Sequence, residues 1–586
     1  MCGIYGAVNF KKNCIDLGQM NAISSKISRR GPDDEGQYQP SDSVFLGHRR
    51  LSIIDLSQAS HQPMVDKALN LSIVFNGTIY NYPSLRKKLM GYGYEFFSKG
   101  DTEVIIKAYH KWGQACVEHL HGMFAFAIWD ESEQLLFIAR DRMGIKPLYF
   151  AKTDETFYFA SSAMALVATG VCDTSLNPQA LHNQLSLHAV VPAPNTIFNG
   201  IHKFRPAYLM TVTQAGEITE RRYWDLIAKR SAETKSAEQW QEEIEQALLN
   251  AVKTRVEVSD VPVGVLLSGG LDSSLIVALL AKAGVEDFKT FSIGFEDIGD
   301  EKGSEFEFSD AVVERYKTDH QKIIVPNTEV LKRLPEAVAN MSEPMVGQDS
   351  VAFYLLAEQV SKSVKVVLSG QGADEVFAGY FWYPRMEEES GDFQQRFSKH
   401  YIDRSHDEYL QMMSPKYASD DVTSAFIKKE LNTEHADTFM DAVLRMDVTN
   451  LIVDDPVKRV DNMTMAWGLE SRVPFLDQKL VELAFQMPPE LKLQHGGKGI
   501  LKQIARGLIP DAVIDRPKGY FPMPALKYVR GEFYEFMSDV LMSQKSRERG
   551  LFSGKYIDML LKEPEQHFTK LNGSKLWHCA LLEYWL

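Results

Sequence analysis

The stretch "VPVGVLLSGGLDSSLIVALLAKAG" constrains the fold of this chain more than any other part of it. An apolar run ends in a glycine pair and a helix-forming run follows at once, which indicates a buried strand, a tight turn and a helix. Further strand-like runs ("KTFSIGF", "HQKIIVP" and "VKVVLSG") alternate with helical segments downstream, and the chain beyond about residue 385 is mostly helical in pattern. This alternation predicts an α/β domain whose parallel sheet is wrapped by helices.

The part of the chain before about residue 225 follows a different pattern. Runs such as "GIYGAVNF", "LSIVFNG" and "MFAFAIWD" are rich in aromatic and β-branched residues, which predicts an α+β domain of packed antiparallel sheets. A polar stretch at 227–239 is the predicted linker. A chain of 586 residues is too long for one hydrophobic core, so its length predicts two or three domains. The change of pattern and the linker place two of them at 2–226 and 235–586. The helix after the linker carries one apolar face: Trp240, Ile244, Leu248, Ala251 and Val252.

Composition excludes several classes of protein. The net charge is −14 and no dense Lys/Arg block occurs, so nucleic acid is not an expected partner. No apolar stretch approaches the length of a membrane span, and the N-terminus lacks a secretory signal pattern. The five cysteines are scattered and form no C-x-x-C pair, which predicts a reducing, cytoplasmic location.

The loop "LLSGGLDSS" carries the most specific local chemistry. A glycine turn at a helix N-terminus presents backbone N–H groups that suit phosphate. The predicted phosphate contacts are Leu267, Ser268, Gly269, Gly270, Ser273 and Ser274. Asp272 would repel phosphate unless a divalent cation lay between them. The alternative interpretation of this loop is a glycine turn that only caps the helix. The loop is not a P-loop, and the other glycine-rich segment with a lysine, "HGGKGI" at 495–500, does not satisfy the P-loop pattern either.

This loop resembles the pyrophosphate loop of the ATP-pyrophosphatase families, which cleave ATP between the α and β phosphates and adenylate a substrate. The resemblance implies a second acidic site, and "VKVVLSGQGADEVFAGY" has the right form. Asp374 would hold Mg²⁺ together with Asp272, while Ser369, Gly370 and Ile293 would lie near the nucleotide. The alternative for Asp374 is a plain helix cap.

The N-terminal half carries "MCGIYGAV", "SRRGPDDEG", "GHRRLSIIDLS", "FNGTIYN", "GDTEVI" and "ARDRMGIKPLYF". In order and spacing these resemble the class II glutamine amidotransferase domain, an Ntn-hydrolase-like αββα sandwich. The resemblance implies that Met1 is removed and that Cys2 becomes the N-terminal nucleophile. An α-amino group has a pKa of about 8, so it can act as general base for the thiol of its own residue.

The same resemblance assigns the glutamine contacts. Asn76 and Gly77 would form the oxyanion hole, Arg50 would bind the α-carboxylate and Asp101 the α-ammonium. Taken alone, Cys2 could open an ordinary buried strand and "NG" could be a hairpin turn. The family commonly reads "NGEIYN", and here Thr78 replaces a carboxylate that helps to bind the ammonium.

Both halves together resemble the asparagine synthetase (glutamine-hydrolysing) family over almost the full length. This implies an ATP-dependent carbon–nitrogen ligase that takes its amide nitrogen from glutamine and releases AMP and pyrophosphate. By the same resemblance, "VDNMTMAWGLESRVPFLD" and the residues before it place Lys458, Arg459 and Asp461 near the synthetase pocket. "DRPKGYFPMP" supplies Lys518, which would stabilise the adenylate and the departing pyrophosphate.

The amidated substrate is the open question, and it centres on Gln371. Asparagine synthetases commonly have glutamate there; a neutral amide cannot act as a base, so another group deprotonates the attacking ammonium or ammonia arrives neutral. The flanking stretches look most like a bacterial branch that amidates N-acetylglutaminylglutamine, an osmoprotectant precursor. Aromatic residues suit such a larger acyl group: Phe381, Trp382, Tyr383 and Tyr520.

Three rival functions follow from the same residues. They are asparagine synthesis from aspartate, ring closure by a β-lactam-forming relative, and non-catalytic nucleotide binding. The intact Cys2 argues against the second, and Asp272 with Asp374 against the third. The sequence leaves the oligomeric state open, a homodimer included.

Overall fold

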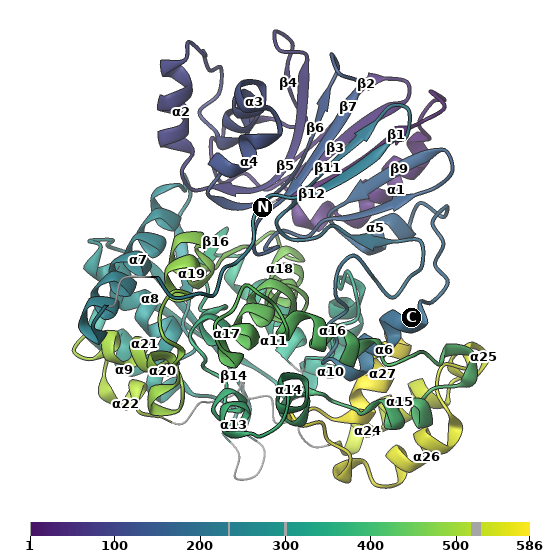
Figure 1. Cartoon of the computed structure of the whole chain (residues 1–586), viewed down its shortest axis with the longest axis vertical. Coiled ribbons are helices and arrows are strands. Elements are labelled where there is room, and N and C mark those ends of the chain that lie inside the picture. Colours follow the sequence, from purple (N-terminus) through teal and green to yellow (C-terminus); the bar gives the residue numbers. More distant parts are fainter. Residues whose placement is uncertain (1, 232–234, 298–301, 348, 517–528) are drawn as a thin grey trace.

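The computed structural model describes residues 2–231, 235–297, 302–347, 349–516 and 529–586, and it has two halves (Figure 1). In the described part of the N-terminal half, two six-stranded antiparallel sheets have the orders β10-β8-β9-β1-β3-β2 and β12-β11-β7-β6-β5-β4. The strands are β1 (Gly3–Asn9), β2 (Asp34–Ser41), β3 (Val44–Arg50), β4 (Met64–Asp66), β5 (Leu71–Ile79), β6 (Gly122–Asp130), β7 (Leu135–Arg140), β8 (Tyr149–Lys152), β9 (Thr156–Ala160), β10 (His202–Lys203), β11 (Tyr208–Thr213) and β12 (Ile218–Arg222).

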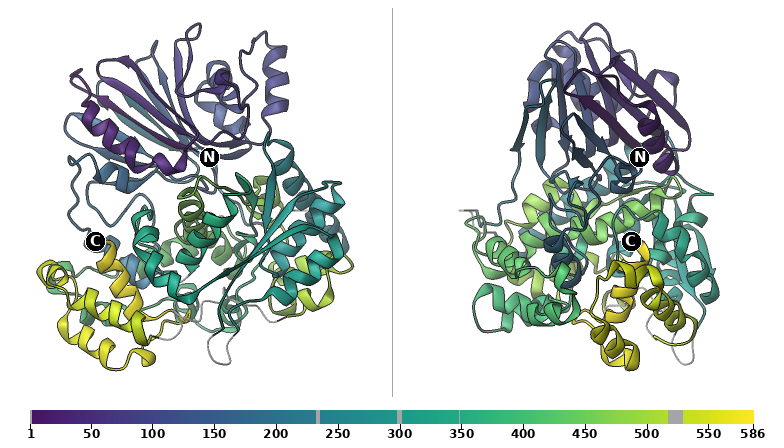
Figure 2. Two further views of the ribbon diagram at one scale, coloured as in Figure 1. Left: turned by 180° about the vertical axis from the view of Figure 1, so that it is seen from behind. Right: turned by 90° about the vertical axis from the view of Figure 1, so that its right-hand side faces the viewer.

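The two sheets stack face to face, as Figure 2 shows. Apolar side chains from both sheets, such as Val8, Leu46, Val74 and Ala127, fill the layer between them. One outer face is covered by α1 (Leu17–Lys26) and α5 (Ala163–Val167), and the other by α2 (Tyr82–Gly91), α3 (Asp101–Trp112) and α4 (Cys116–His119). The predicted αββα sandwich is confirmed.

The described C-terminal half is built on a five-stranded parallel sheet of order β15-β14-β13-β16-β17. Its strands are β13 (Val263–Leu266), β14 (Lys289–Phe295), β15 (Asp319–Val325), β16 (Val366–Leu368) and β17 (Glu470–Arg472). The predicted parallel sheet is confirmed. The strand β17 was not expected from the sequence, because three residues within a mostly helical region carry no strand periodicity.

Helices surround this sheet and form the rest of the half (Figure 1). They are α7 (Ala237–Glu257), α8 (Leu271–Lys282), α9 (Phe306–Tyr316), α10 (Asn327–Ala339), α11 (Asp349–Val360), α12 (Ala373–Val376), α13 (Trp382–Glu388), α14 (Phe393–Tyr401), α15 (His406–Met412), α16 (Val422–Leu431), α17 (Phe439–Met446), α18 (Lys458–Met465), α19 (Gln478–Ala484), α20 (Pro489–Leu493), α21 (Gly499–Ala505), α22 (Asp511–Ile514), α24 (Gly531–Met542), α25 (Gln544–Arg549), α26 (Gly554–Lys562) and α27 (Lys575–Trp585). From the N-terminal half, α6 (Pro178–Ser186) packs against α15 and α16.

The helix α7 shows how the sequence determines local structure. Its N-cap Ser236 accepts a hydrogen bond from the Gln239 backbone N–H, and the Gln239 side chain accepts one from the Ser236 N–H, which is a capping box. All five residues of the predicted apolar face are buried. None of the helices in the described part of the chain combines the length and the apolarity that a membrane crossing requires.

Candidate functional site

Cys2 lies directly before β1 in a small pocket of the N-terminal half, here called the N-terminal pocket. Arg50, Gly77 and Asp101 line this pocket with it, so the structure brings these predicted residues together. The Cys2 backbone N–H donates a hydrogen bond to Asn76 Oδ1 at 2.9 Å. Burial raises the pKa of the Cys2 thiol above its usual value, so the thiol needs a base before it can attack.

Asn76 and Gly77 lie within β5 and pair with β6, so the hairpin-turn alternative for "NG" is wrong. The Asn76 Nδ2 atom is buried and has no hydrogen-bond partner among the described residues. A Cβ atom at position 77 would lie 2.1 Å from the Met123 carbonyl oxygen, so only glycine fits there. A buried donor without a partner, beside a backbone that approaches closely, suits the developing negative charge of a tetrahedral intermediate.

Arg50 and Asp101 place opposite charges in the pocket. Arg50 ends β3, and its Nη2 donates to the Asp55 carbonyl oxygen at 2.5 Å. Asp101 begins α3 and its Oδ2 accepts a hydrogen bond from the Ile79 N–H at 3.0 Å. Burial raises the pKa of the Asp101 carboxyl to about 6. The pocket therefore presents opposite charges that match the two charged groups of a zwitterionic amino acid.

The raised pKa of Asp101 predicts a pH dependence of glutamine binding. If Asp101 contacts the α-ammonium group, as the family resemblance implies, only its ionised carboxylate can do so, and protonation below pH about 6 would remove this contact. We expect Asp101→Asn to lower kcat/KM for glutamine hydrolysis by about 10- to 100-fold at pH 8. The ratio of wild-type to variant kcat/KM should fall as the pH drops through about 6, whereas the ionisations of the nucleophile and base cancel in this ratio. A ratio that is constant from pH 5 to 8, a range of about three units, would contradict the assignment.

The C-terminal cavity lies at the carboxyl ends of β13, β14 and β16, where open parallel sheets bind ligands. It measures about 840 Å³ and is lined by most of the residues predicted to contact ATP: Leu267, Ser268, Gly270, Asp272, Ser273, Ile293, Ser369 and Gly370. The two others do not line it. The Gly269 carbonyl oxygen accepts a hydrogen bond from Arg516 Nη1 at 3.0 Å, and Ser274 is buried within α8.

Asp272 and Asp374 converge in this cavity on a residue that sequence reasoning missed, Lys498. Its Nζ lies 2.6 Å from Asp272 Oδ2 and 2.8 Å from Asp374 Oδ1. Burial opposes the charge on Lys498, but the two carboxylates outweigh it and raise the pKa of the ammonium above its usual value. The two carboxylates were predicted to share a Mg²⁺ ion, and in the structure the Lys498 ammonium group lies between them. The only sequence signal was the glycine-rich "HGGKGI", which fails the P-loop pattern.

Comparison with known proteins finds a family match for each half of the chain. Residues 243–586 match the asparagine synthase family and residues 1–224 match a glutamine amidotransferase domain. The chain belongs to the asparagine synthase family. It is 31% identical to asparagine synthetase [glutamine-hydrolyzing] 3 of Bacillus subtilis, over 97% of this chain and 94% of the relative. It is 30% identical to asparagine synthetase 1 of the same organism, over 100% and 96%, and 29% identical to asparagine synthetase B of Escherichia coli, over 89% and 82%.

As a member of the asparagine synthase family, the protein is a glutamine-dependent, ATP-using carbon–nitrogen ligase. Its substrates are glutamine, ATP and a carboxylate. The structure corrects where two charged residues of the family's "VDNMTMAWGLESRVPFLD" region lie. Arg459 lines the C-terminal cavity, with its Nε 3.1 Å from Asp349 Oδ1. Asp461 instead pairs with Arg30 of the N-terminal half at 2.8 Å, and Lys458 is buried at the boundary between the halves.

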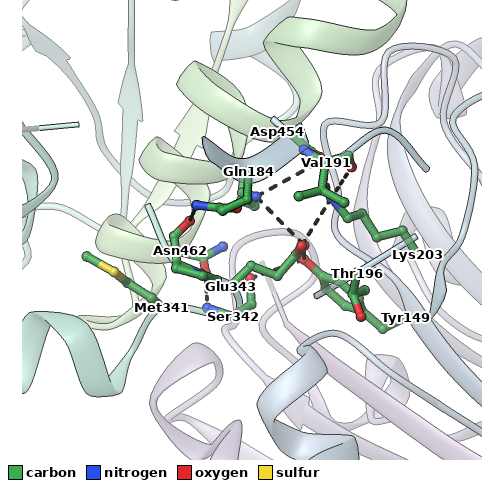
Figure 3. Close-up of polar contacts among 12 residues, drawn as sticks. Tyr149, Gln184, Val191, Thr196, Lys203, Met341, Ser342, Glu343, Asp454 and Asn462 are labelled. Atoms are coloured by element: carbon green, nitrogen blue, oxygen red, sulfur yellow. Dashed lines mark hydrogen bonds and ion pairs between the residues drawn. The ribbon is translucent and has the colours of Figure 1, made fainter. Parts of the chain in front are cut away.

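A cluster of buried polar side chains lies at this boundary between the halves (Figure 3). Lys203 Nζ lies 3.1 Å from Glu343 Oε2 and also pairs with Asp454. The Tyr149 hydroxyl donates to Glu343 Oε1 at 2.8 Å. Lys458 Nζ lies 3.7 Å from the same carboxylate. Lys458 thus places a positive charge beside Glu343 at the boundary between the two halves. It does not line the C-terminal cavity.

Not all of the aromatic residues that were predicted to suit a larger acyl group line the C-terminal cavity. Phe381 lines the C-terminal cavity, together with Tyr380, which sequence reasoning missed. Trp382 and Tyr383 are buried in the hydrophobic core, and the Tyr383 hydroxyl donates to Asp447, because helical geometry turns consecutive side chains to different faces. Lys518 and Tyr520 lie outside the described residues.

Proposed function

We propose that residues 2–226 hydrolyse glutamine to ammonia and that residues 235–586 use this ammonia to amidate an adenylated carboxylate. The observation that carries the proposal is the pair of sites in one chain. Cys2, Asn76, Arg50 and Asp101 converge in the N-terminal pocket, and Asp272 and Asp374 converge in the C-terminal cavity.

In the first reaction, loss of Met1 would free the α-amino group of Cys2, which takes the proton of its own thiol. The thiolate attacks the glutamine carboxamide carbon while Asn76 Nδ2 and the Gly77 N–H stabilise the oxyanion. The α-amino group returns this proton to the amide nitrogen, ammonia leaves with formation of the thioester, and water then hydrolyses the thioester to glutamate. The contact between the Cys2 nitrogen and Asn76 Oδ1 supports this arrangement, because it orients the amine and the amide together.

In the second reaction, the acceptor carboxylate attacks the α-phosphorus of ATP, and pyrophosphate leaves. Ammonia then attacks the acyl carbon of the adenylate, and AMP leaves. We propose that Asp272 and Asp374 hold Mg²⁺, because two carboxylates that already share one cation offer the oxygen ligands that this ion prefers. When bound, Mg²⁺ neutralises charge on the departing pyrophosphate. Lys498, and Lys518 by family resemblance, add positive charge at the same phosphates.

For the acceptor we propose the C-terminal carboxylate of N-acetylglutaminylglutamine; aspartate is the alternative, consistent with the names of the relatives. Two features support the larger substrate. The C-terminal cavity, which would also hold ATP, extends from the glycine loop to Tyr380 and Phe381, so two aromatic side chains line it. Gln371 lines the same cavity, so the residue that departs from the asparagine synthetase pattern faces the ligand space.

The test measures pyrophosphate release with ATP, Mg²⁺ and ammonium, and compares the acetylated dipeptide with aspartate. We expect the dipeptide to be preferred at least about tenfold in kcat/KM, which corresponds to about 1.4 kcal/mol of selectivity. The C-terminal amide of the same dipeptide is the matched control, because it has no carboxylate and should release no pyrophosphate. Turnover with aspartate alone would overturn the choice of acceptor and leave the ligase reaction intact.

We also propose a cytoplasmic location, which is supported by five cysteines that are all free of disulfides. Association into a homodimer stays a prediction, to be checked by light scattering.

A further inference from the structure

A carboxylate from the C-terminal half reaches the N-terminal pocket. Glu470 is the first residue of β17, which lies at the edge of the parallel sheet. Its side chain nevertheless lines the pocket that contains Cys2, Arg50 and Asp101. Only 1% of Glu470 is exposed. The pocket is thus built from both halves of the chain.

Glu470 contacts the position at which this chain departs from the common family pattern. The Thr78 hydroxyl donates a hydrogen bond to Glu470 Oε1 at 3.3 Å, across 392 positions of sequence. Thr78 follows Gly77 in β5 and is short, so it leaves room for a carboxylate that arrives from the opposite half. The pocket therefore contains a second acidic group although position 78 has none.

The charges around the two acids differ. Asp101 has a pKa of about 6 because it is buried, so its charge is partly lost in mildly acidic solution. Burial would also raise the pKa of Glu470, but nearby positive charges outweigh it and lower the pKa below its usual value; Arg472 and Lys146 contribute to this lowering. The Arg472 Nε donates to Glu470 Oε1 at 2.6 Å, which also holds the side chain in place. A buried ammonium group requires such a permanent anion nearby.

We propose that Glu470 binds the α-ammonium group of glutamine, so that the synthetase half supplies the second carboxylate of the glutaminase pocket. The proposal rests on the proposed function, because it takes glutamine as the ligand of this pocket. A second contact crosses the same boundary: Arg30 Nε donates to the Cys2 carbonyl oxygen at 3.2 Å, and Arg30 Nη1 lies 2.8 Å from Asp461 Oδ2. The glutamine site is then complete only when the two halves are docked.

The test compares glutamine with 4-carbamoylbutanoate, which is glutamine without its α-amino group. Glu470→Gln removes the charge and keeps the shape, so kcat/KM for glutamine should fall by about 10- to 100-fold. The value for 4-carbamoylbutanoate should fall far less, because this substrate has no ammonium group to bind. The preference for glutamine over the analogue should therefore collapse. Ammonia-dependent synthesis, which does not use this pocket, reports that the variant is folded.

Two further variants make the result specific. The double variant Thr78→Glu, Glu470→Gln supplies the carboxylate from the N-terminal half in place of the C-terminal half. It should restore most of the preference for glutamine. Glu482→Gln is the matched control, because Glu482 also crosses the boundary, accepting from Trp224 Nε1 at 2.7 Å, but does not line the pocket. We expect this control to keep the wild-type preference.

Equal losses for both substrates in Glu470→Gln, or an unchanged preference for glutamine, would overturn the inference. If Glu470→Gln does not fold, Glu470→Asp decides. Its shorter side chain keeps the charge and should lower the preference several-fold, whereas a wild-type preference would overturn the inference. If the wild-type enzyme hydrolyses neither substrate, the proposed function fails and not the role of Glu470 alone.

Discussion

Replacing Cys2 with alanine should abolish glutamine-dependent amide formation and leave ammonia-dependent amide formation at the wild-type rate. Alanine has no nucleophile, so no thioester forms and no ammonia is released from glutamine. We expect a loss of at least about 10³-fold in the glutamine-dependent rate. Cys2 does not line the C-terminal cavity, so adenylation and attack by added ammonia remain.

The measurement follows amide product by chromatography, with either glutamine or ammonium chloride as the nitrogen source. Cys14→Ala is the matched control, because Cys14 is exposed and lies outside the N-terminal pocket. It should match the wild type with both nitrogen sources. If Cys2→Ala still forms amide from glutamine at the wild-type rate, the nucleophile has been assigned wrongly.

The second large effect is expected for Asp374→Asn, in the opposite half. The substitution removes one of the two negative charges that converge on Lys498 and leaves the side chain nearly the same size. We expect pyrophosphate release to fall by about 10²- to 10³-fold and to require more Mg²⁺, because the proposed Mg²⁺ site would lose the charge of one oxygen ligand. Hydrolysis of glutamine in the absence of an acceptor should continue at the wild-type rate.

Asp310→Asn provides the control for this experiment. Asp310 is a partly exposed aspartate on α9 that pairs with Lys322 at 2.7 Å, outside the cavity. It should leave both pyrophosphate release and the Mg²⁺ requirement unchanged. Wild-type pyrophosphate release in Asp374→Asn would show that the carboxylate pair has no part in nucleotide activation.

Several features of the fold were predictable because they depend on neighbours in sequence. The glycine loop before α8 is such a feature, because a strand, a tight turn and a helix follow directly on one another. The buried face of α7 is another, since its residues repeat with the period of the helix. By contrast, Trp382 and Tyr383 are buried in the hydrophobic core and do not line the cavity as predicted. An aromatic run in the sequence does not show which side of a short helix faces a cavity.

The two kinds of fold could be predicted from the sequence alone, and so could the candidate residues Cys2, Asp272 and Asp374. The contacts that these residues make depend on the tertiary structure. Lys498 joins Asp272 across 226 positions, and Glu470 joins Thr78 across 392. Local patterning cannot reveal such contacts, because their partners are set by how the sheet and the two halves pack. The pocket around Cys2 is therefore a property of the whole chain, and not of the N-terminal half alone.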